Sequence, residues 1–379
     1  MKKKLFGKHL DFYEAIATLV GTTIGAGIFG IPFVVAKSGI LSGIICLAVL
    51  SFVVLMINLY VGEICLRTKK VHQLAGFAEL YLGKNGKAIM ALITVFSIVG
   101  ALIAYIIGEG QVLSAIFGGS SFLFSMLFFV IASFLLYFDL KAIEKAELYL
   151  SFFMIFVIMV IIAISFGHIN MENLSNLSLG NIFLPYGVIL FALVGASAIP
   201  GMEKEMQYNK QKLKKAIIIG TLIPFVVYFL FMIAVVGVTG LATTEIATIG
   251  LGQKIGEYMI LLGNIFPVFS MSTSFLALGL ALKWMLHYDY KWHHSIAWFA
   301  TCITPLLLFF AGAKSFINVI GITGAVAGGL EGIMIIIIAK KAKEKCEQAP
   351  LYSIPIPLLL QIILIILFVL GIVYQFVKF

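Results

Sequence analysis

Two glycine-rich stretches interrupt long apolar runs, and their backbone groups are the first candidates for chemistry. One reads Gly21-Thr-Thr-Ile-Gly25-Ala-Gly27-Ile-Phe-Gly30-Ile-Pro32, and the other reads Phe191-Ala-Leu-Val-Gly195-Ala-Ser-Ala-Ile-Pro200. A helix in lipid must satisfy its own backbone, so a break is tolerated only where the freed groups face protein, water or a ligand. Interrupted helices in corresponding positions of two halves indicate the substrate site of a secondary transporter.

The freed backbone groups suit a zwitterion. Glycine lets the backbone approach a ligand, and the start of a half-helix attracts a carboxylate through its N–H groups and dipole. We expect the carboxylate at the N–H groups of Gly25, Ala26, Gly27 and Ile28. We expect the ammonium at carbonyls of the second break, around Phe191, Ala192, Val194 and Gly195. The alternative is that these glycines only allow close helix packing.

Aromatic side chains are candidates for the rest of the pocket. Tyr105 is expected near the level of the breaks, where its hydroxyl would close the site or hold the carboxylate. The alternative is a tyrosine in the outer aromatic belt. Phe191 and Phe275 are candidates for lining the side-chain pocket, in a chain with 33 phenylalanines.

Two carboxylates fall well inside apolar segments, away from the segment ends, where acids are rare and indicate function. Glu109 is expected one helical turn outward of Tyr105, in an outer vestibule, and Glu331 near a glycine-rich helix face. Each is a candidate for proton coupling. Each has the alternative of a structural carboxylate that hydrogen-bonds to a broken helix.

The composition is that of an all-α integral membrane protein. Of the 379 residues, 62% are hydrophobic and 11% charged, and the mean hydropathy is +1.12. A soluble domain carries about 25% charged residues. Eleven apolar runs are long enough to cross a membrane, and they form one domain over 1–379. The runs are 11–36, 40–65, 87–117, 121–138, 144–166, 183–200, 213–238, 253–285, 295–312, 315–340 and 353–377.

The cations indicate orientation. If the N-terminus is cytoplasmic, 22 of the 26 Lys and Arg residues fall on the inner side, Lys283 among them, as the positive-inside rule requires. Eleven crossings then place the C-terminus outside, in a multi-pass protein of the cell membrane. The +9 net charge is spread over six inner segments and indicates topology, not a nucleic-acid partner.

Signs of an enzyme or a resident cofactor are missing from the sequence. The four cysteines show no CxxC or Cys/His ligand spacing, so a disulfide or zinc site is not expected. A membrane enzyme would need a nucleophile with a base, a metal cluster or a cofactor motif, and none is present. We therefore expect a bound coupling ion at most.

Several stretches resemble the amino acid/polyamine/organocation superfamily, especially its hydroxy and aromatic amino acid permeases and its amino acid/auxin permeases. The first break is similar to the family's helix 1 motif. Further similarities span residues 21–324 in the family's order, at Tyr81–Gly86, Ala104–Gly110, Thr273–Leu276 and Phe316–Gly324. The resemblance implies coupled import of an amino acid by a LeuT-like fold.

The same fold implies a 5+5 inverted repeat with broken helices 1 and 6. Five segments precede the second break, so helices 1–5 and 6–10 can be related by inverted topology. The first repeat is 11–166, the second is 183–340, and helix 11 at 353–377 is additional.

The resemblance also implies a sodium site between helices 1 and 8. It aligns Thr273 and Ser274 with paired hydroxyl ligands, and the carbonyls of Gly21, Ile24 and Ser270 supply the remaining oxygens. Na⁺ is favoured over H⁺, and hydrogen bonding between helices is the alternative for these hydroxyls.

The sequence departs from the aromatic permeases at three places. Helix 6 reads Gly195-Ala-Ser197 without the expected His, Gln111 stands where an acid is expected, and Lys283-Trp284 replaces an expected Asp. Because no Arg, Lys or acid is placed at the level of the two breaks, we expect a substrate with an uncharged side chain, and these departures leave it either aromatic or aliphatic. A divalent-metal or small organic cation transporter of the same fold is the alternative, although the first break lacks the acid that a metal requires.

Overall fold

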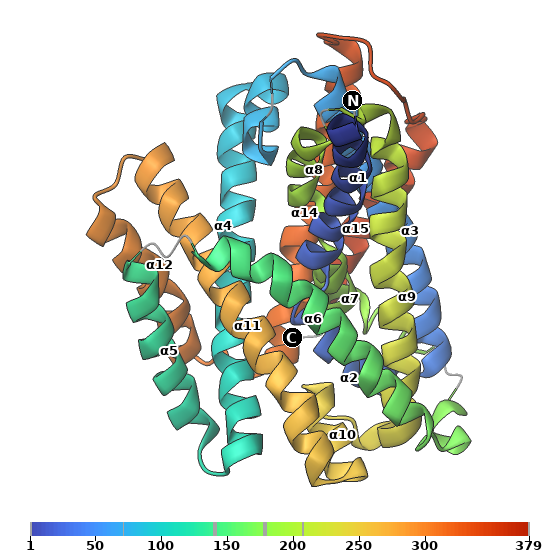
Figure 1. The fold of residues 1–379 in the computed structure, drawn as a ribbon, viewed down its shortest axis with the longest axis vertical. Helices are drawn as coiled ribbons and strands as arrows, with labels where there is room; N and C mark the ends of the chain where they lie inside the picture. The colour runs from blue at the N-terminus through green and yellow to red at the C-terminus, as the bar shows by residue number, and fades with distance from the viewer. Residues whose placement is uncertain (1, 71, 139–141, 177–179, 207, 378–379) are drawn as a thin grey trace.

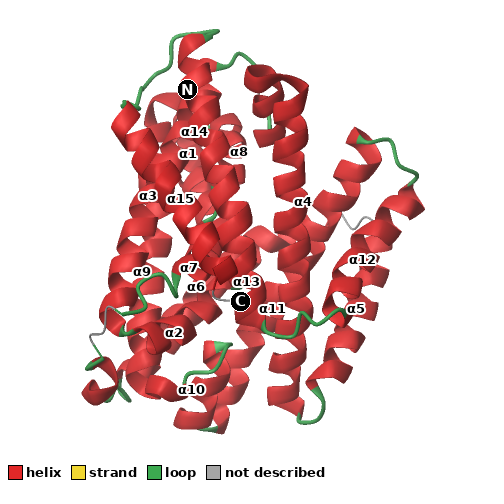
Figure 2. Ribbon diagram, turned by 180° about the vertical axis from the view of Figure 1, so that it is seen from behind, coloured by secondary structure: helices red, strands yellow, loops and turns green. Residues whose placement is uncertain are grey.

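The computed structural model describes residues 2–70, 72–138, 142–176, 180–206 and 208–377. All regular secondary structure in these residues is helical (Figure 1 and Figure 2), because a helix satisfies the backbone of an apolar segment internally. The α-helices are α1 (Lys2–Thr23), α2 (Gly27–Ser38), α3 (Ile40–Arg67), α4 (Leu74–Phe117), α5 (Ser121–Tyr137), α6 (Ala142–Phe166), α7 (Tyr186–Leu193), α8 (Ile199–Glu205), α9 (Leu213–Thr239), α10 (Ala247–Ile255), α11 (Glu257–Trp284), α12 (His294–Phe310), α13 (Phe316–Thr323), α14 (Gly329–Glu344) and α15 (Leu358–Val377).

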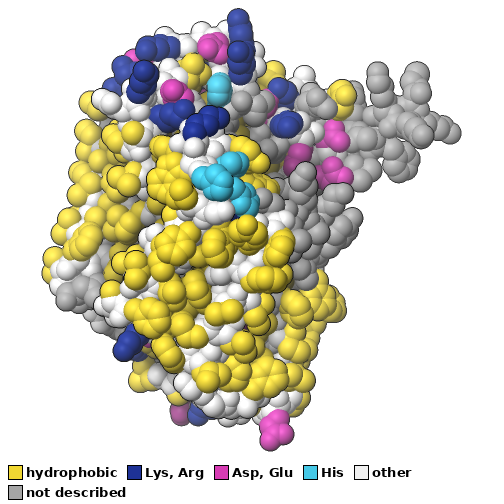
Figure 3. Space-filling view, turned by 90° about the vertical axis from the view of Figure 1, so that its left-hand side faces the viewer, with side chains coloured by type: hydrophobic (Ala, Val, Ile, Leu, Met, Phe, Trp, Pro, Cys, Tyr) yellow, Lys and Arg dark blue, Asp and Glu magenta, His cyan; other side chains and the backbone are white. Residues whose placement is uncertain are grey.

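Several of these helices are suited to a membrane. Within the described residues, seven helical stretches are long and apolar enough to cross one, and the bent pair α1 and α2 makes an eighth. Three shorter apolar helices accompany them, at Ser121–Tyr137, Phe153–Phe166 and His294–Phe310. Figure 3 shows hydrophobic side chains covering the middle of one face, with Lys and Arg gathered toward one end.

Two helix boundaries differ from the predicted segments. The segment predicted at 87–117 continues back to Leu74, and the chain turns sharply at Gly83, where φ is +79°. The segment predicted at 253–285 is divided at Gly256, where φ is +131°. Both conformations are left-handed and favour glycine. Hydropathy alone detects neither turn, because each turn is made by a single glycine between two helical stretches.

The helices form two groups that lie side by side in Figure 1. In one group α4 packs against α5, α11 and α12. In the other, α9 packs against α1, α2 and α3, and α3 also contacts α7 and α8. Helix α6 contacts both α9 and α11, and α13 contacts both α4 and α7. The two interrupted helices, α1 with α2 and α7 with α8, therefore belong to the same group.

Lys283 lies in the helix packing, whereas the cation distribution had assigned it to an inner segment at the membrane surface. Its side chain is fully buried, and its Nζ donates to the carbonyl oxygen of Leu136 at 2.6 Å. That carbonyl belongs to the last turn of α5, where a cation interacts favourably with the helix dipole. Lys283 therefore ties α11 to the end of α5.

Candidate functional site

The first break lies where the glycine motif predicted it. Helix α1 ends at Thr23 and α2 begins at Gly27, with a bend of 55° between them. In the described part of the chain, the N–H groups of Ala26 and Gly27 have no backbone acceptor, and the carbonyls of Gly21 and Ile24 receive no backbone donor. Two donors and two acceptors are therefore left for a ligand, an ion or water.

The other two predicted N–H donors are already used within the break. The N–H of Gly25 donates to the carbonyl of Thr23 at 3.0 Å, and that of Ile28 donates to the carbonyl of Gly25 at 3.4 Å. The set of four expected carboxylate donors thus reduces to Ala26 and Gly27 in this structure.

The second break has a similar form. Helix α7 ends at Leu193, Val194 is extended with ψ 124°, and a short 3₁₀ turn over Ala196–Ala198 leads into α8. The N–H of Val194 completes the last turn by donating to Leu190 at 3.1 Å. The chain then runs without regular structure through Gly195, beside the first break.

Close contacts join the two breaks. A Cβ atom on Gly27 would lie 2.6 Å from the Cα of Ala192, and one on Gly195 would lie 2.5 Å from the Oγ1 of Thr23. Both distances are shorter than van der Waals contact allows. Glycine at position 27 lets its backbone meet that of Ala192, and glycine at position 195 leaves room for the Thr23 side chain, as in small-residue packing between membrane helices.

Gly25 differs from Gly27 in its surroundings. A Cβ atom on Gly25 would have no heavy atom within 4 Å, so this residue borders open space. Thr22 and Ser197, one in each break region, are exposed. The open side of the breaks is therefore at Gly25, and the space beside Gly27 is filled by Ala192.

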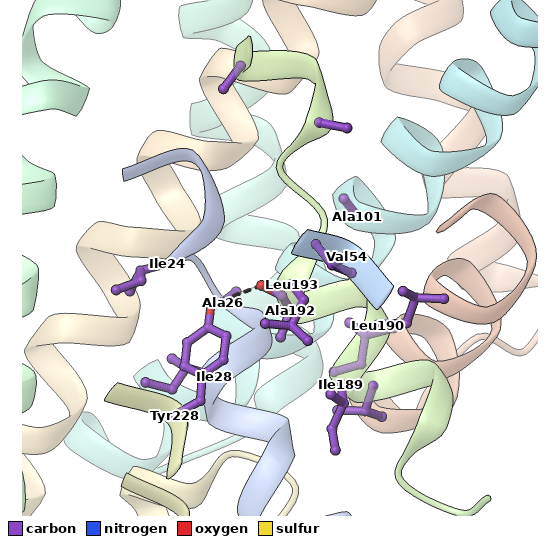
Figure 4. Close-up of a cluster of buried hydrophobic side chains, with 14 of the residues drawn as sticks. Ile24, Ala26, Ile28, Val54, Ala101, Ile189, Leu190, Ala192, Leu193 and Tyr228 are labelled. Atoms are coloured by element: carbon purple, nitrogen blue, oxygen red, sulfur yellow. Dashed lines mark hydrogen bonds between the residues drawn. The ribbon is translucent and has the colours of Figure 1, made fainter. Parts of the chain in front are cut away.

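Tyr228 of α9 contacts both breaks and was not identified from the sequence. Its hydroxyl lies 2.7 Å from the carbonyl oxygen of Thr23 and 2.9 Å from that of Ala192, and Figure 4 shows the side chain among the buried residues. The side chain is fully buried. A tyrosine in an apolar helix was the available signal, but the chain has 14 tyrosines.

The predicted aromatic residues lie at different places. Tyr105 of α4 is buried. Phe191 is half-buried in the last turn of α7, and its backbone packs against Gly324. Phe275 is fully buried in α11, and its ring contacts Phe128 of α5 with centroids 5.2 Å apart. Phe275 therefore contributes to packing between α11 and α5 in this structure.

Glu109 is fully buried between α4 and α11, and does not face the outer vestibule in which the sequence placed it. The hydroxyl of Ser272 donates to its Oε1 at 2.7 Å. Its Oε2 is buried and has no hydrogen-bond partner among the described residues. One oxygen of this carboxyl is thus paired, and the other is buried without a partner among the described residues.

Glu331 lines a small cavity behind the second break. The cavity has a volume of about 20 Å³ and is also bordered by Asn58 of α3 and by Val194. The Oδ1 atom of Asn58 is buried and has no partner in the described structure. A cavity of this size with polar walls has room for one water molecule. A larger cavity, of about 600 Å³, lies away from the breaks between α4, α5 and α12.

The helix 8 hydroxyls lie on α11, which is not among the helices that α1 contacts most extensively. Thr273 donates to the carbonyls of Phe269 and Ser270, at 2.8 Å and 3.2 Å, and Ser270 is fully buried. Ser274 is half-buried. Helix α1 packs mainly against α9, α8 and α6. In the described residues no hydrogen bond joins the first break to Thr273 or Ser274, so the sodium site stays a prediction.

A known protein family and several known proteins match nearly the whole chain. The tryptophan/tyrosine permease family matches over residues 8–377. Glutamine transporter 2 of Aliivibrio fischeri is 28% identical over 370 residues, which cover 92% of each chain. Tyrosine-specific transport system 1 of Haemophilus influenzae is 23% identical over 359 residues, which cover 88% of each.

Two solved structures are similar in fold. MhsT in complex with L-phenylalanine has a TM-score of 0.68 at 15% identity, covering 97% of this chain and 98% of that one. Mhp1, a nucleobase-cation-symport-1 family transporter, has a TM-score of 0.58 at 14% identity, covering 86% of this chain and 77% of that one. The family match includes both breaks and the described helices around them. The chain therefore belongs to the tryptophan/tyrosine permease family and is a multi-pass membrane permease, not an enzyme.

Proposed function

We propose that this permease imports a neutral amino acid, aromatic or aliphatic, in symport with a cation, by alternating access. The observation that carries the proposal is the meeting of two helix breaks, with unpaired N–H groups in one and an open side at Gly25. Uptake of a panel of labelled amino acids into proteoliposomes tests it. Absence of uptake for every amino acid, with and without ion gradients, would refute it.

Recognition of the substrate backbone follows from the two breaks. The N–H groups of Ala26 and Gly27 lie at the start of the 12-residue α2, where a carboxylate is stabilised. At the end of α7, the carbonyl of Val194 receives no backbone donor among the described residues and is the proposed acceptor for the ammonium, whereas that of Ala192 already accepts from Tyr228. The named substrates of the relatives support an amino acid: glutamine and tyrosine, and phenylalanine in the similar structure.

The proposed side-chain selectivity follows from the charges around the breaks. Residues 21–30 and 191–200 contain no charged side chain. The nearby carboxyl of Glu331 faces a cavity that has room for water only. We expect tryptophan, tyrosine, leucine, alanine or glutamine to compete with the best substrate more strongly than arginine or glutamate, because an unpaired charge would be desolvated in the pocket. Stronger competition by arginine or glutamate in the uptake assay would contradict this selectivity.

The proposed topology has eleven spans in a 5+5 inverted repeat plus helix 11, with a cytoplasmic N-terminus and an external C-terminus. The position of the breaks and the gathering of cations toward one end (Figure 3) support it. Labelling of single cysteines from each side of the membrane tests the orientation.

Alternating access is proposed to involve the inner half-helices α1 and α8. Ten of the 12 residues of α2 are buried, so the outer half of the first broken helix is covered. On α1, by contrast, Tyr13 is 67% exposed and Thr22 is exposed. The hydroxyl of Thr18 donates to Glu205 at 3.2 Å, which links α1 to α8. We therefore propose that the described conformation faces inward and that the two inner half-helices move together.

Sodium is the proposed coupling ion. The carbonyls of Gly21 and Ile24 are free of backbone donors, and α11 offers the oxygens of Ser270, Thr273 and Ser274. Hard oxygen ligands of this kind suit a small cation. Movement of α1 toward α11 would bring these two sets of oxygens together and complete the site. Sodium binding and closure of the inner side of the transporter would then occur together.

The double variant Thr273→Ala, Ser274→Ala is expected to lose the sodium dependence of uptake, because two of the five oxygen ligands are removed. The measurement is initial uptake against sodium concentration at constant pH. Thr301→Ala is the matched control, since its hydroxyl makes the same local bond, to Ala297 at 2.8 Å, on α12. Unchanged sodium dependence in the double variant, or uptake driven by a pH gradient without sodium, would overturn the sodium assignment.

In that event a carboxyl becomes the coupling group, and Glu109 and Glu331 are the alternatives. Glu331 borders the second break, whereas Glu109 is bonded to Ser272 away from it. Comparison of Glu331→Gln with Glu109→Gln for proton-driven uptake separates them.

A further inference from the structure

The hydroxyl of Tyr228 lies where the two breaks meet. It reaches the carbonyl of Thr23, the last residue of α1, and the carbonyl of Ala192, in the last turn of α7. These carbonyls are 169 positions apart in the chain, yet one atom of a third helix contacts both. The carbonyl oxygens of Thr23 and Ala192 lie 2.7 Å and 2.9 Å from the Tyr228 hydroxyl oxygen, which is within hydrogen-bond distance.

One hydroxyl proton serves two acceptors at this point. A tyrosine O–H donates one hydrogen bond at a time, so the three oxygens share a single proton. Thr23 also receives the N–H of Gly25, whereas Ala192 has no other donor among the described residues. Without Tyr228 the Ala192 carbonyl would be buried and unpaired, which is unfavourable. The surrounding chain is too crowded to offer a substitute, because Gly27 contacts Ala192 directly.

The hydroxyl is not needed for filling space. Tyr228 is fully buried between apolar residues of the core, and a phenylalanine ring would fill nearly the same volume. The polar atom therefore acts on the two carbonyls. We propose that Tyr228 is a positioning residue that fastens the two breaks to each other, so that they keep a fixed spacing and move as one unit. The effect of Tyr228 on substrate affinity rests on the proposed function, whereas the fastening of the two breaks does not.

Hydrogen exchange of the whole chain in lipid nanodiscs tests the fastening. In Tyr228→Phe we expect amide exchange to rise by roughly threefold or more in peptides from both breaks, around 19–30 and 190–199, because both carbonyls lose their shared donor. Tyr60→Phe is the matched control. Tyr60 is also a fully buried tyrosine, and its hydroxyl bonds to Pro355 at 3.4 Å, outside the breaks. This control should leave exchange at both breaks unchanged.

The pattern of exchange separates positioning from general support of the fold. A merely structural role would raise exchange along α9 and lower the melting temperature, with no selective effect at the breaks. Unchanged exchange at either break in Tyr228→Phe would overturn the proposal. Substrate affinity is measured separately. If the wild type takes up no amino acid, the proposed function fails, while the exchange result still decides the role of Tyr228.

Discussion

Replacement of Gly25 by leucine is expected to abolish amino-acid uptake while the protein still folds. The leucine side chain would occupy the open space beside the first break, where the substrate is proposed to bind. Gly25 does not have a left-handed backbone, so the substitution introduces no strain of that kind. We expect a loss of roughly 100-fold or more in uptake, typical of a blocked or displaced substrate. Proteoliposome uptake and the melting temperature are the measurements.

The control for this variant is Gly167→Leu. Gly167 follows α6, is exposed, and has only one backbone atom near its Cβ position, at 3.6 Å. The substitution adds the same side chain away from the breaks, and this variant should take up amino acids normally. Wild-type uptake by Gly25→Leu would show that the open side of the break is not the substrate site. Gly27→Leu is a poorer probe, because its side chain would collide with Ala192 and disrupt packing whether or not a substrate binds there.

Replacement of Glu63 by glutamine is expected to cause the largest loss of stability among single polar substitutions in the chain. The carboxylate is 2% exposed and pairs with Arg67 and Lys343, each at 2.8 Å. It also accepts bonds from the Ser353 hydroxyl at 2.9 Å and the Ile354 N–H at 2.7 Å. These contacts join α3 to α14 and to the segment before α15. Loss of the charge leaves Arg67 and Lys343 without the carboxylate, bonded only to neutral acceptors among the described residues.

Breaking a buried ion pair costs about 3–5 kcal/mol, and we expect the lower end because Arg67 and Lys343 keep partial access to water. The measurement is the free energy or midpoint of thermal unfolding in detergent. Glu344→Gln, which removes an exposed pair with Lys341, is the control and should not shift the midpoint measurably. An equal effect of the two substitutions would mean that the Glu63 cluster is no more stabilising than a surface pair.

Local sequence determined where helices form and where two of them break. Apolar runs of membrane length can satisfy their backbones only as helices, so the helical class followed from composition. The glycines and prolines of 21–32 and 191–200 specified the interruptions, because conformational freedom and a missing N–H are properties of the residue itself. The resemblance to amino acid permeases also rested on such short stretches, and the family match confirmed it.

Tertiary structure decided which side of each break is available. Gly25 and Gly27 are two residues apart, yet one borders open space and the other contacts Ala192. Which space is filled depends on Ala192 of α7, which is 165 positions from Gly27 in the chain. Likewise, the burial of Glu109 and Lys283 depends on partners from other helices, Ser272 and Leu136, and periodicity does not reveal those partners.

Tyr228 gives the clearest separation between the two levels. In the sequence it is a tyrosine within an apolar helix, equally suited to a core or to an interface. Its relation to the breaks exists only after α9 packs against α1 and α2, which brings its hydroxyl to carbonyls 205 and 36 positions away. The helices, their breaks and the backbone groups that the breaks release thus follow from local residue types. Which of those groups are already paired follows from helix packing, because pairing depends on residues distant in the chain.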